Sequence, residues 1–228
     1  MVRASTLPPS RWSFDSAAWP AEDCVAVGAD LEPATVVDAY THGAFPMPAD
    51  GIDAMLWWSP VRRGVLRVAD AHVSRSMRRA LNRFSITVDE SFADVLAACA
   101  DPNRPGAWID DDIRAAYTRL HELGWAHSIE ARDRDGTLAG GLYGLAIGGL
   151  FAGESMFHHV RDASKVAMIG LVGLLDDEHA AERLIDVQWR TPHLASLGVT
   201  EVSREAYLGA LPKVCAAPLP RAFATSLA

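Results

Sequence analysis

Hydrophobic and polar positions recur along this chain with two different periods, which predict helices and strands in turn. Val73, Met77 and Leu81 recur every four residues, a spacing typical of an amphipathic helix over 73–83. Residues 183–188 alternate with a period of two, as a strand does. The remaining predicted helices are 33–43, 90–99, 111–123, 163–176, 191–197 and 203–211, and the remaining predicted strands are 64–68, 84–89, 125–131, 137–146 and 149–153. Helices interspersed with a mostly antiparallel sheet indicate an α+β or mixed α/β fold.

Local signals define several of these boundaries. Asp110 and Asp162 stand where a helix N-cap is expected, and Gly124 follows the end of a predicted helix. The turn at 133–136 joins two predicted strands. Residues 1–60 are instead rich in proline, tryptophan and small residues. We therefore expect a small N-terminal lobe over 1–62 and a larger domain over 63–228.

Composition narrows the class of protein. Half of the 228 residues are hydrophobic and 22% are charged, which is typical of a globular chain with a sizeable core. The sequence has no apolar run long enough to cross a membrane and no secretory signal pattern. Its three cysteines are widely spaced, so they predict neither a disulfide framework nor a Cys-x-x-Cys metal site. We expect a cytoplasmic protein without a membrane segment.

The net charge of −8 argues against nucleic acid as a partner until its distribution is considered. Residues 61–84 contain seven arginines and one acid, so this segment carries +6 and the rest of the chain −14. Four of these arginines flank the apolar stripe of the 73–83 helix: Arg75, Arg78, Arg79 and Arg83. A basic helix face can bind the phosphates of a nucleic acid, although a solvated helix face explains the same pattern.

Several familiar motifs are absent. His121, Glu122 and His127 lack the His-Glu-x-x-His spacing of a zinc protease. The segment 153–157 ends in Phe157 where a nucleophile elbow requires glycine. The glycines at 140–149 form neither a dinucleotide-binding motif nor a phosphate-binding loop. We expect no metal and no cofactor.

Three groups of residues remain candidates for a functional site. Glu154 interrupts the apolar run 151–157, and Asp186 and Gln188 share one face of a predicted central strand. Polar side chains on such a face are costly unless they are hydrogen-bonded, so they mark either a site or a satisfied structural network. The third group is aromatic and suits either the core or stacking on unpaired RNA bases: Phe45, Trp57, Trp58, Trp108 and Phe151.

These residues, together with many others, resemble the bacterial leucyl/phenylalanyl-tRNA–protein transferases. The matching stretches, in chain order, are 27–31, 43–46, 56–60, 72–77, 108–109, 117, 120–124, 126–130, 140–144, 150–151, 153–157, 163–165, 184–186, 188 and 193–198. The resemblance covers most of the chain. An RNA-binding module that has lost catalysis is the alternative, against which the intact Glu154, Asp186 and Gln188 argue.

The resemblance implies a transferase that moves Leu or Phe, and Met less readily, from aminoacyl-tRNA to proteins with N-terminal Arg or Lys, marking them for degradation. It also implies a C-terminal domain resembling the GCN5-related N-acetyltransferases. The glycine-rich loop by which such domains bind coenzyme A is missing before residue 162. The expected partners are therefore aminoacyl-tRNA and the acceptor protein, and the enzyme is expected to be a monomer.

By this resemblance, Asp186 and Gln188 are the catalytic pair and Glu154 lies in the same site. A carboxylate such as Asp186 could accept the proton of the attacking amine, while Glu154 positions the amine or its cationic side chain. The family pattern assigns four residues to an apolar pocket for the transferred side chain: Leu142, Phe151, Leu171 and Ile185. Each methylene in such a pocket discriminates by only ~1–3 kcal/mol, so acceptance of Leu, Phe and Met should be graded.

The resemblance also predicts a site for the terminal adenosine of the tRNA. Trp108 matches a family tryptophan there, whereas Met47 stands where many relatives carry Trp. Methionine stacks less well on a base, so we expect either a weaker grip on the adenosine or a compensating contact from Trp57 or Trp58.

Overall fold

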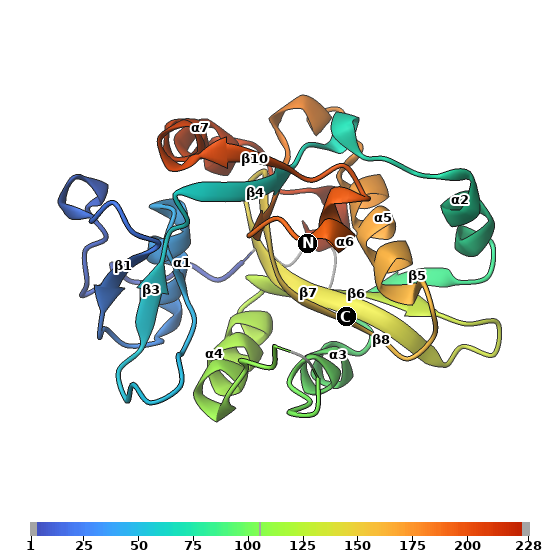
Figure 1. Ribbon diagram of the computed structural model, residues 1–228, viewed down its shortest axis with the longest axis horizontal. Helices are drawn as coiled ribbons and strands as arrows, with labels where there is room; N and C mark the ends of the chain where they lie inside the picture. Colours follow the sequence, from blue (N-terminus) through green and yellow to red (C-terminus); the bar gives the residue numbers. More distant parts are fainter. Residues whose placement is uncertain (1–3, 105, 225–228) are drawn as a thin grey trace.

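A computed structural model describes residues 4–104 and 106–224, which form a small N-terminal sheet and a larger mixed sheet (Figure 1). The larger sheet has seven strands in the order β10-β4-β9-β8-β7-β6-β5. Their bounds are β4 Arg62–Leu66, β5 Ser85–Val88, β6 Ala126–Arg132, β7 Leu138–Ile147, β8 Leu150–His158, β9 Leu184–Gln188 and β10 Thr200–Ser203. The fold is thus α+β, as the sequence predicts.

Neighbouring strands of this sheet run antiparallel, except for the central pair β8 and β9. These two parallel strands pair only from Leu150 to Ala152 on β8 and from Leu184 to Asp186 on β9. Their remaining residues diverge, which leaves unpaired backbone in the middle of the sheet. An interruption of this kind opens a space that side chains or a ligand can fill.

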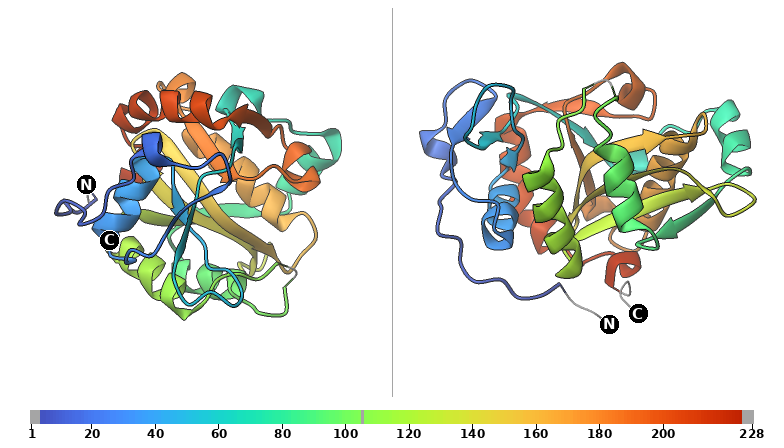
Figure 2. Two further views of the ribbon diagram at one scale, coloured as in Figure 1. Left: turned by 60° about the vertical axis from the view of Figure 1, so that its left-hand side comes forward. Right: turned by 90° about the horizontal axis from the view of Figure 1, so that it is seen from below.

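Helices cover both faces of the large sheet (Figures 1 and 2). On one face lie α3 (Phe92–Cys99) and α4 (Asp111–Glu122), and on the other lie α5 (Ala163–Leu175) and α2 (Arg75–Leu81). Helix α5 is buried along most of its length because its sequence is apolar on nearly every side. The shorter elements are α6 Pro192–Ala195, α7 Arg204–Ala216, α8 Arg221–Ala224, and the 3₁₀ turns Ser16–Ala18, Val68–Asp70 and Ala180–Glu182.

The N-terminal lobe contains a three-stranded sheet in the order β1-β3-β2 (Figure 1). Its elements are β1 Cys24–Val27, α1 Pro33–Thr41, β2 Phe45–Pro46 and β3 Leu56–Trp58. Helix α1 contacts α4 and α7 of the larger domain, and one continuous hydrophobic cluster includes residues of both parts. Trp57 belongs to this core: it is fully buried, and its indole N–H donates to the Gly28 carbonyl at 2.6 Å. It is therefore not a surface available for stacking on a base.

Most predicted elements are confirmed to within a few residues, including the turn at 133–136 and the Asp110 cap, whose carboxylate accepts the Ile113 N–H. Three predictions need correction. Strand β8 continues to His158, helix α7 continues through Pro212 to Ala216, and Asp162 makes no side-chain cap. Asp162 has a φ of 73° and instead pairs with Arg83 at 3.3 Å. In the described part of the chain, no helix is long and apolar enough to span a membrane.

Candidate active site

A small cavity lies where β8 and β9 diverge. It has a volume of about 100 Å³, and both polar and apolar residues of the two strands line it. The lining residues are Leu142, Gly153, Glu154, Ser155, Met156, Met168, Val187, Gln188 and Leu194. The cavity therefore has largely apolar walls, with a carboxylate and an amide on one side.

Asp186 lies beside this cavity in the fully buried part of β9. The Arg63 guanidinium donates to both of its oxygens, from Nε to Oδ1 at 2.8 Å and from Nη2 to Oδ2 at 2.5 Å. The Tyr207 hydroxyl donates to Oδ2 at 2.8 Å, and the Gln188 backbone N–H donates to Oδ1 at 2.9 Å. Because a carboxylate offers about four lone-pair positions, these four donors occupy its accepting capacity.

Gln188 ends β9 in a left-handed backbone conformation, with a φ of 57°. This conformation is strained for a residue with a Cβ, so contacts must restrain it. The hydrogen bond from the Gln188 N–H to Asp186 is one such restraint. Gly64 on β4 faces this turn, and a Cβ there would lie 2.8 Å from the Arg190 nitrogen. The turned backbone lets the Gln188 side chain reach Glu154, with Nε2 and Oε1 3.4 Å apart.

Glu154 is the second carboxylate, and its surroundings differ from those of Asp186. It accepts a hydrogen bond from the Tyr117 hydroxyl at 3.0 Å, and Tyr117 in turn pairs with the Tyr40 hydroxyl at 2.7 Å. Burial raises the pKa of Glu154 to about 8, although the two tyrosines oppose the shift. Burial also raises the pKa of both tyrosines, so they remain neutral donors. Glu154 therefore has the basicity that proton transfer near neutral pH requires.

The structure brings the three predicted catalytic residues together and separates the four predicted pocket residues. Leu142 lines the cavity. Phe151, Leu171 and Ile185 are fully buried in the core on the α5 side of the sheet and are not among the residues that line it.

Of the residues expected at the adenosine site, Met47, Trp58 and Trp108 are partly exposed, whereas Trp57 is buried. Met47 and Trp58 are neighbours on the small sheet, where the Trp58 indole N–H donates to the Met47 carbonyl at 2.8 Å. Trp58 also contacts Trp189 edge to face, with ring centroids 6.1 Å apart. Trp108 lies in the segment before α4 and packs against the core.

The structure contains the predicted basic helix, α2, but one arginine of the +6 segment 61–84 has another role. In α2, Met77 and Ala80 are buried. The predicted tRNA-binding residues are exposed: Arg75, Arg78 and Arg79 in α2, and Arg83 just after it. Arg63, by contrast, is completely buried against Asp186. The charge at the surface of this segment is accordingly lower than the sequence count.

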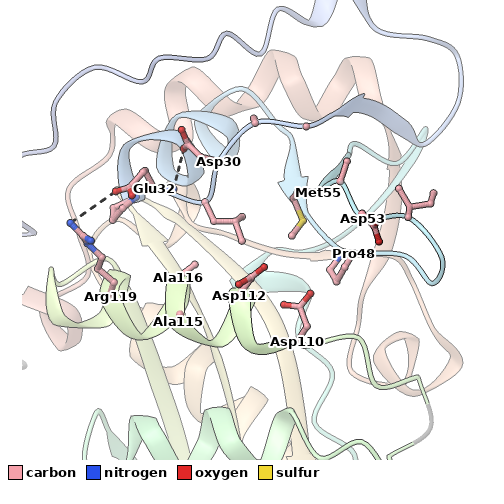
Figure 3. Close-up of a pocket in the computed structure, with 16 residues that line it drawn as sticks. Asp30, Glu32, Pro48, Asp53, Met55, Asp110, Asp112, Ala115, Ala116 and Arg119 are labelled. Atoms are coloured by element: carbon pink, nitrogen blue, oxygen red, sulfur yellow. Dashed lines mark hydrogen bonds and ion pairs between the residues drawn. The ribbon is translucent and has the colours of Figure 1, made fainter.

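A separate, larger cleft of about 570 Å³ lies between the N-terminal lobe and α4 (Figure 3). Five acidic residues and one arginine line it: Asp30, Glu32, Asp53, Asp110, Asp112 and Arg119. Glu32 and Arg119 approach to 4.0 Å across its edge. The cleft shares no lining residue with the cavity beside Glu154. Part of the acidic charge of the chain is thus concentrated here.

Sequence reasoning missed several residues of the site: Tyr40, Arg63, Tyr117, Met156, Met168, Val187, Leu194 and Tyr207. For Arg63, a signal existed. Arg62 and Arg63 directly precede the predicted strand 64–68, and adjacent strand residues point to opposite faces. A strand that extends to include both places one arginine on each face, and the arginine on the packed face requires an acid as partner.

The Glu154 carboxylate and the Gln188 amide thus face one small, largely apolar pocket. Among the described residues, no cluster of three or more His, Cys, Asp or Glu side chains could hold a metal ion. A sequence model described as "Leucyl/phenylalanyl-tRNA protein transferase" matches residues 65–212, and one for the N-terminal domain of that family matches residues 29–61.

Curated proteins agree with this match. The leucyl/phenylalanyl-tRNA–protein transferase of Aromatoleum aromaticum is 48% identical over 191 residues, which cover 82% of this chain and 79% of the relative. The protein of the same name from Chromohalobacter salexigens is 45% identical over 220 residues, covering 93% and 84% respectively. The chain therefore belongs to the leucyl/phenylalanyl-tRNA–protein transferase family, which confirms the predicted resemblance.

Proposed function

We propose that this protein transfers Leu or Phe, and Met less readily, from aminoacyl-tRNA to the N-terminal Arg or Lys of acceptor proteins, thereby marking them for degradation. Membership of the family supports this activity. The observation that carries the chemistry is the contrast between two carboxylates in one site. Asp186 is fully engaged by donors, whereas Glu154 faces the cavity and has a raised pKa.

Glu154 acts as the proton acceptor in this proposal. The α-amine of the acceptor protein attacks the carbonyl carbon of the aminoacyl ester, forming the new C–N bond. The proton lost from nitrogen passes to Glu154, and collapse of the tetrahedral intermediate releases the terminal ribose hydroxyl of the tRNA. Glu154 can return the proton to that oxygen as it leaves. The ester is already activated, so alignment of amine and carbonyl supplies much of the remaining effect.

Gln188 and Asp186 then have positioning roles of different kinds. The Gln188 carboxamide, beside Glu154 at the cavity, accepts from the incoming amine and orients it. Asp186 fixes the backbone of Gln188 through the hydrogen bond to its N–H. This assignment replaces Asp186 as proton acceptor, because its oxygens already accept four hydrogen bonds.

The apolar walls of the cavity suit the transferred side chain. Leu142 offers an apolar surface, and the unbranched, flexible side chains of Met156 and Met168 can adapt to Leu, Phe or Met. Phe151, Leu171 and Ile185 support these walls from the core. The terminal adenosine is assigned to Trp108, Met47 and Trp58, and the tRNA backbone to the exposed arginines of α2.

The resemblance to GCN5-related acetyltransferases is also part of the proposal. Its support is the parallel pair β8–β9, which separates after three paired residues on each strand and leaves a pocket in the gap. The division at residue 62 has support from the two family models, which end at 61 and begin at 65. We further propose a cytoplasmic monomer that needs neither metal nor cofactor.

A transfer assay tests the function directly. Purified protein is incubated with Phe-tRNA and a peptide that begins with Arg, and the peptide mass is measured. The expected product is heavier by one phenylalanyl residue, whereas a peptide beginning with Asp stays unmodified. Binding of tRNA without any product would instead support an RNA-binding module that has lost catalysis.

A further inference from the structure

Arg63 connects the two parts of the protein at the catalytic strand. It lies on β4, directly after the N-terminal lobe, and its side chain is 1% exposed. Its Nη1 donates to the carbonyl of Gly43 in the lobe at 3.1 Å, while Nε and Nη2 hold Asp186 on β9. Phe45 from the lobe and Tyr207 from α7 lie against its guanidinium, at 4.9 and 4.5 Å from the ring centroids.

This environment constrains the guanidinium strongly. A buried charge is costly unless it is paired and hydrogen-bonded, and Arg63 meets both conditions with fixed, two-point geometry. The fork sets the orientation of the Asp186 carboxylate. Oδ1 of that carboxylate accepts the N–H of Gln188, whose left-handed backbone requires a restraint.

We propose that Arg63 is a positioning residue for the transfer step: through Asp186 it holds the Gln188 side chain at the cavity. Through its contacts with Gly43 and Phe45, it also makes the position of Gln188 depend on the position of the N-terminal lobe. The inference rests on the proposed function, since the step that Arg63 aligns is the attack of the amine. Arg63 touches neither substrate in this scheme, so its effect must appear in the rate and not in substrate affinity.

A purely structural ion pair is the competing explanation, and the chain offers a matched control. Arg183 lies at the opposite end of β9, its side chain is also 1% exposed, and it makes a similar fork to Asp177, at 3.2 and 2.6 Å. Arg183→Lys and Arg63→Lys each replace a buried guanidinium fork and keep the positive charge; the Asp177 side chain is 17% exposed, whereas that of Asp186 is fully buried. Of the two changes, only Arg63→Lys alters the contacts of Asp186 and, through them, Gln188.

The experiment measures single-turnover transfer of Phe from tRNA to an Arg-starting peptide, with enzyme in excess and at saturation. Under these conditions the rate constant does not depend on the folded fraction. We expect Arg63→Lys to lower it ~10²-fold, the cost of a small misplacement of reacting groups. The Kd for tRNA and the KM for peptide should change little. Tyr207→Phe, which removes one bond to Asp186, should cause a smaller loss.

Each outcome has a definite meaning. A rate constant for Arg63→Lys equal to that of the wild type, or lowered no more than that of Arg183→Lys, would overturn the proposal. A loss that appears only in KM or in tRNA affinity would overturn it as well. If the wild-type protein itself forms no product, the proposed function fails instead, so the two failures are distinguishable.

Discussion

Replacing Glu154 with Gln should change the pH dependence of transfer in a way that identifies the base. With a pKa of about 8, about one tenth of Glu154 is ionised at pH 7 and about nine tenths at pH 9. A general base contributes at least ~10²-fold, so Glu154→Gln should lower the single-turnover rate ~10²-fold at pH 9 and only ~10-fold at pH 7. The ratio of wild-type to variant rate should therefore rise about ninefold over this range and then level off.

Taking the ratio removes the titration of the acceptor amine, which ionises near pH 8 in both reactions. Glu130→Gln is the matched control. Glu130 is also buried in the sheet, but it is held by Ser128 and Thr87, away from the cavity. Its ratio to the wild type should stay flat with pH. A flat ratio for Glu154→Gln would refute the assignment of Glu154 as the base.

The same shift has a consequence for stability. The folded protein raises the pKa of Glu154 above its ordinary value, so ionisation of this group disfavours the folded state. The contribution is favourable below pH 4.5 and is lost as the pH rises through 8. Urea unfolding should show that Glu154→Gln gains stability relative to the wild type over this interval.

Further predictions concern the strained turn, the buried acid and the basic helix. In urea, the free energy of unfolding of Gln188→Gly should exceed that of Gln188→Ala by ~1 kcal/mol, because only glycine adopts a φ of 57° without strain. Both variants should lose activity. Asp186→Asn should lose ~3–5 kcal/mol of unfolding free energy, since it leaves a buried guanidinium without its counter-ion; an unchanged urea midpoint would contradict this. Replacing Arg75 and Arg79 with Ala should weaken tRNA binding and make the slope of log K against log salt shallower by about 1.5, whereas Arg114→Ala on α4 should not.

Much of the fold follows from local patterns that the sequence carries openly. The period-four stripe of Met77 and Leu81 defines α2, and Asp110 caps α4 as its side chain predicts. The short strands of the lobe and β10 were missed because they have too few residues for a period to be recognised. Asp162 precedes α5 as predicted, but its side chain makes no cap, because its backbone is left-handed at a φ of 73° and its carboxylate pairs with Arg83.

The candidate site divides in the same way. Its three polar residues could be named from sequence, because an acid or amide within an apolar strand requires a partner or a task. Which carboxylate has which task could not be named, because that depends on neighbours far along the chain. Arg63 and Tyr207, which donate hydrogen bonds to Asp186, lie 123 and 21 residues from it in the sequence. Tyr117, which donates to Glu154, lies 37 residues from it.

The sequence by itself determined the α+β class, the family, the basic helix and the identity of the polar residues, since each depends on spacing or on a local motif. Only the tertiary structure decided that one arginine of the basic segment is buried at Asp186, that β8 and β9 diverge around a cavity, and that Glu154 has the raised pKa. These properties arise from desolvation and from contacts between distant segments, and both exist only once the sheet and the lobe have packed together.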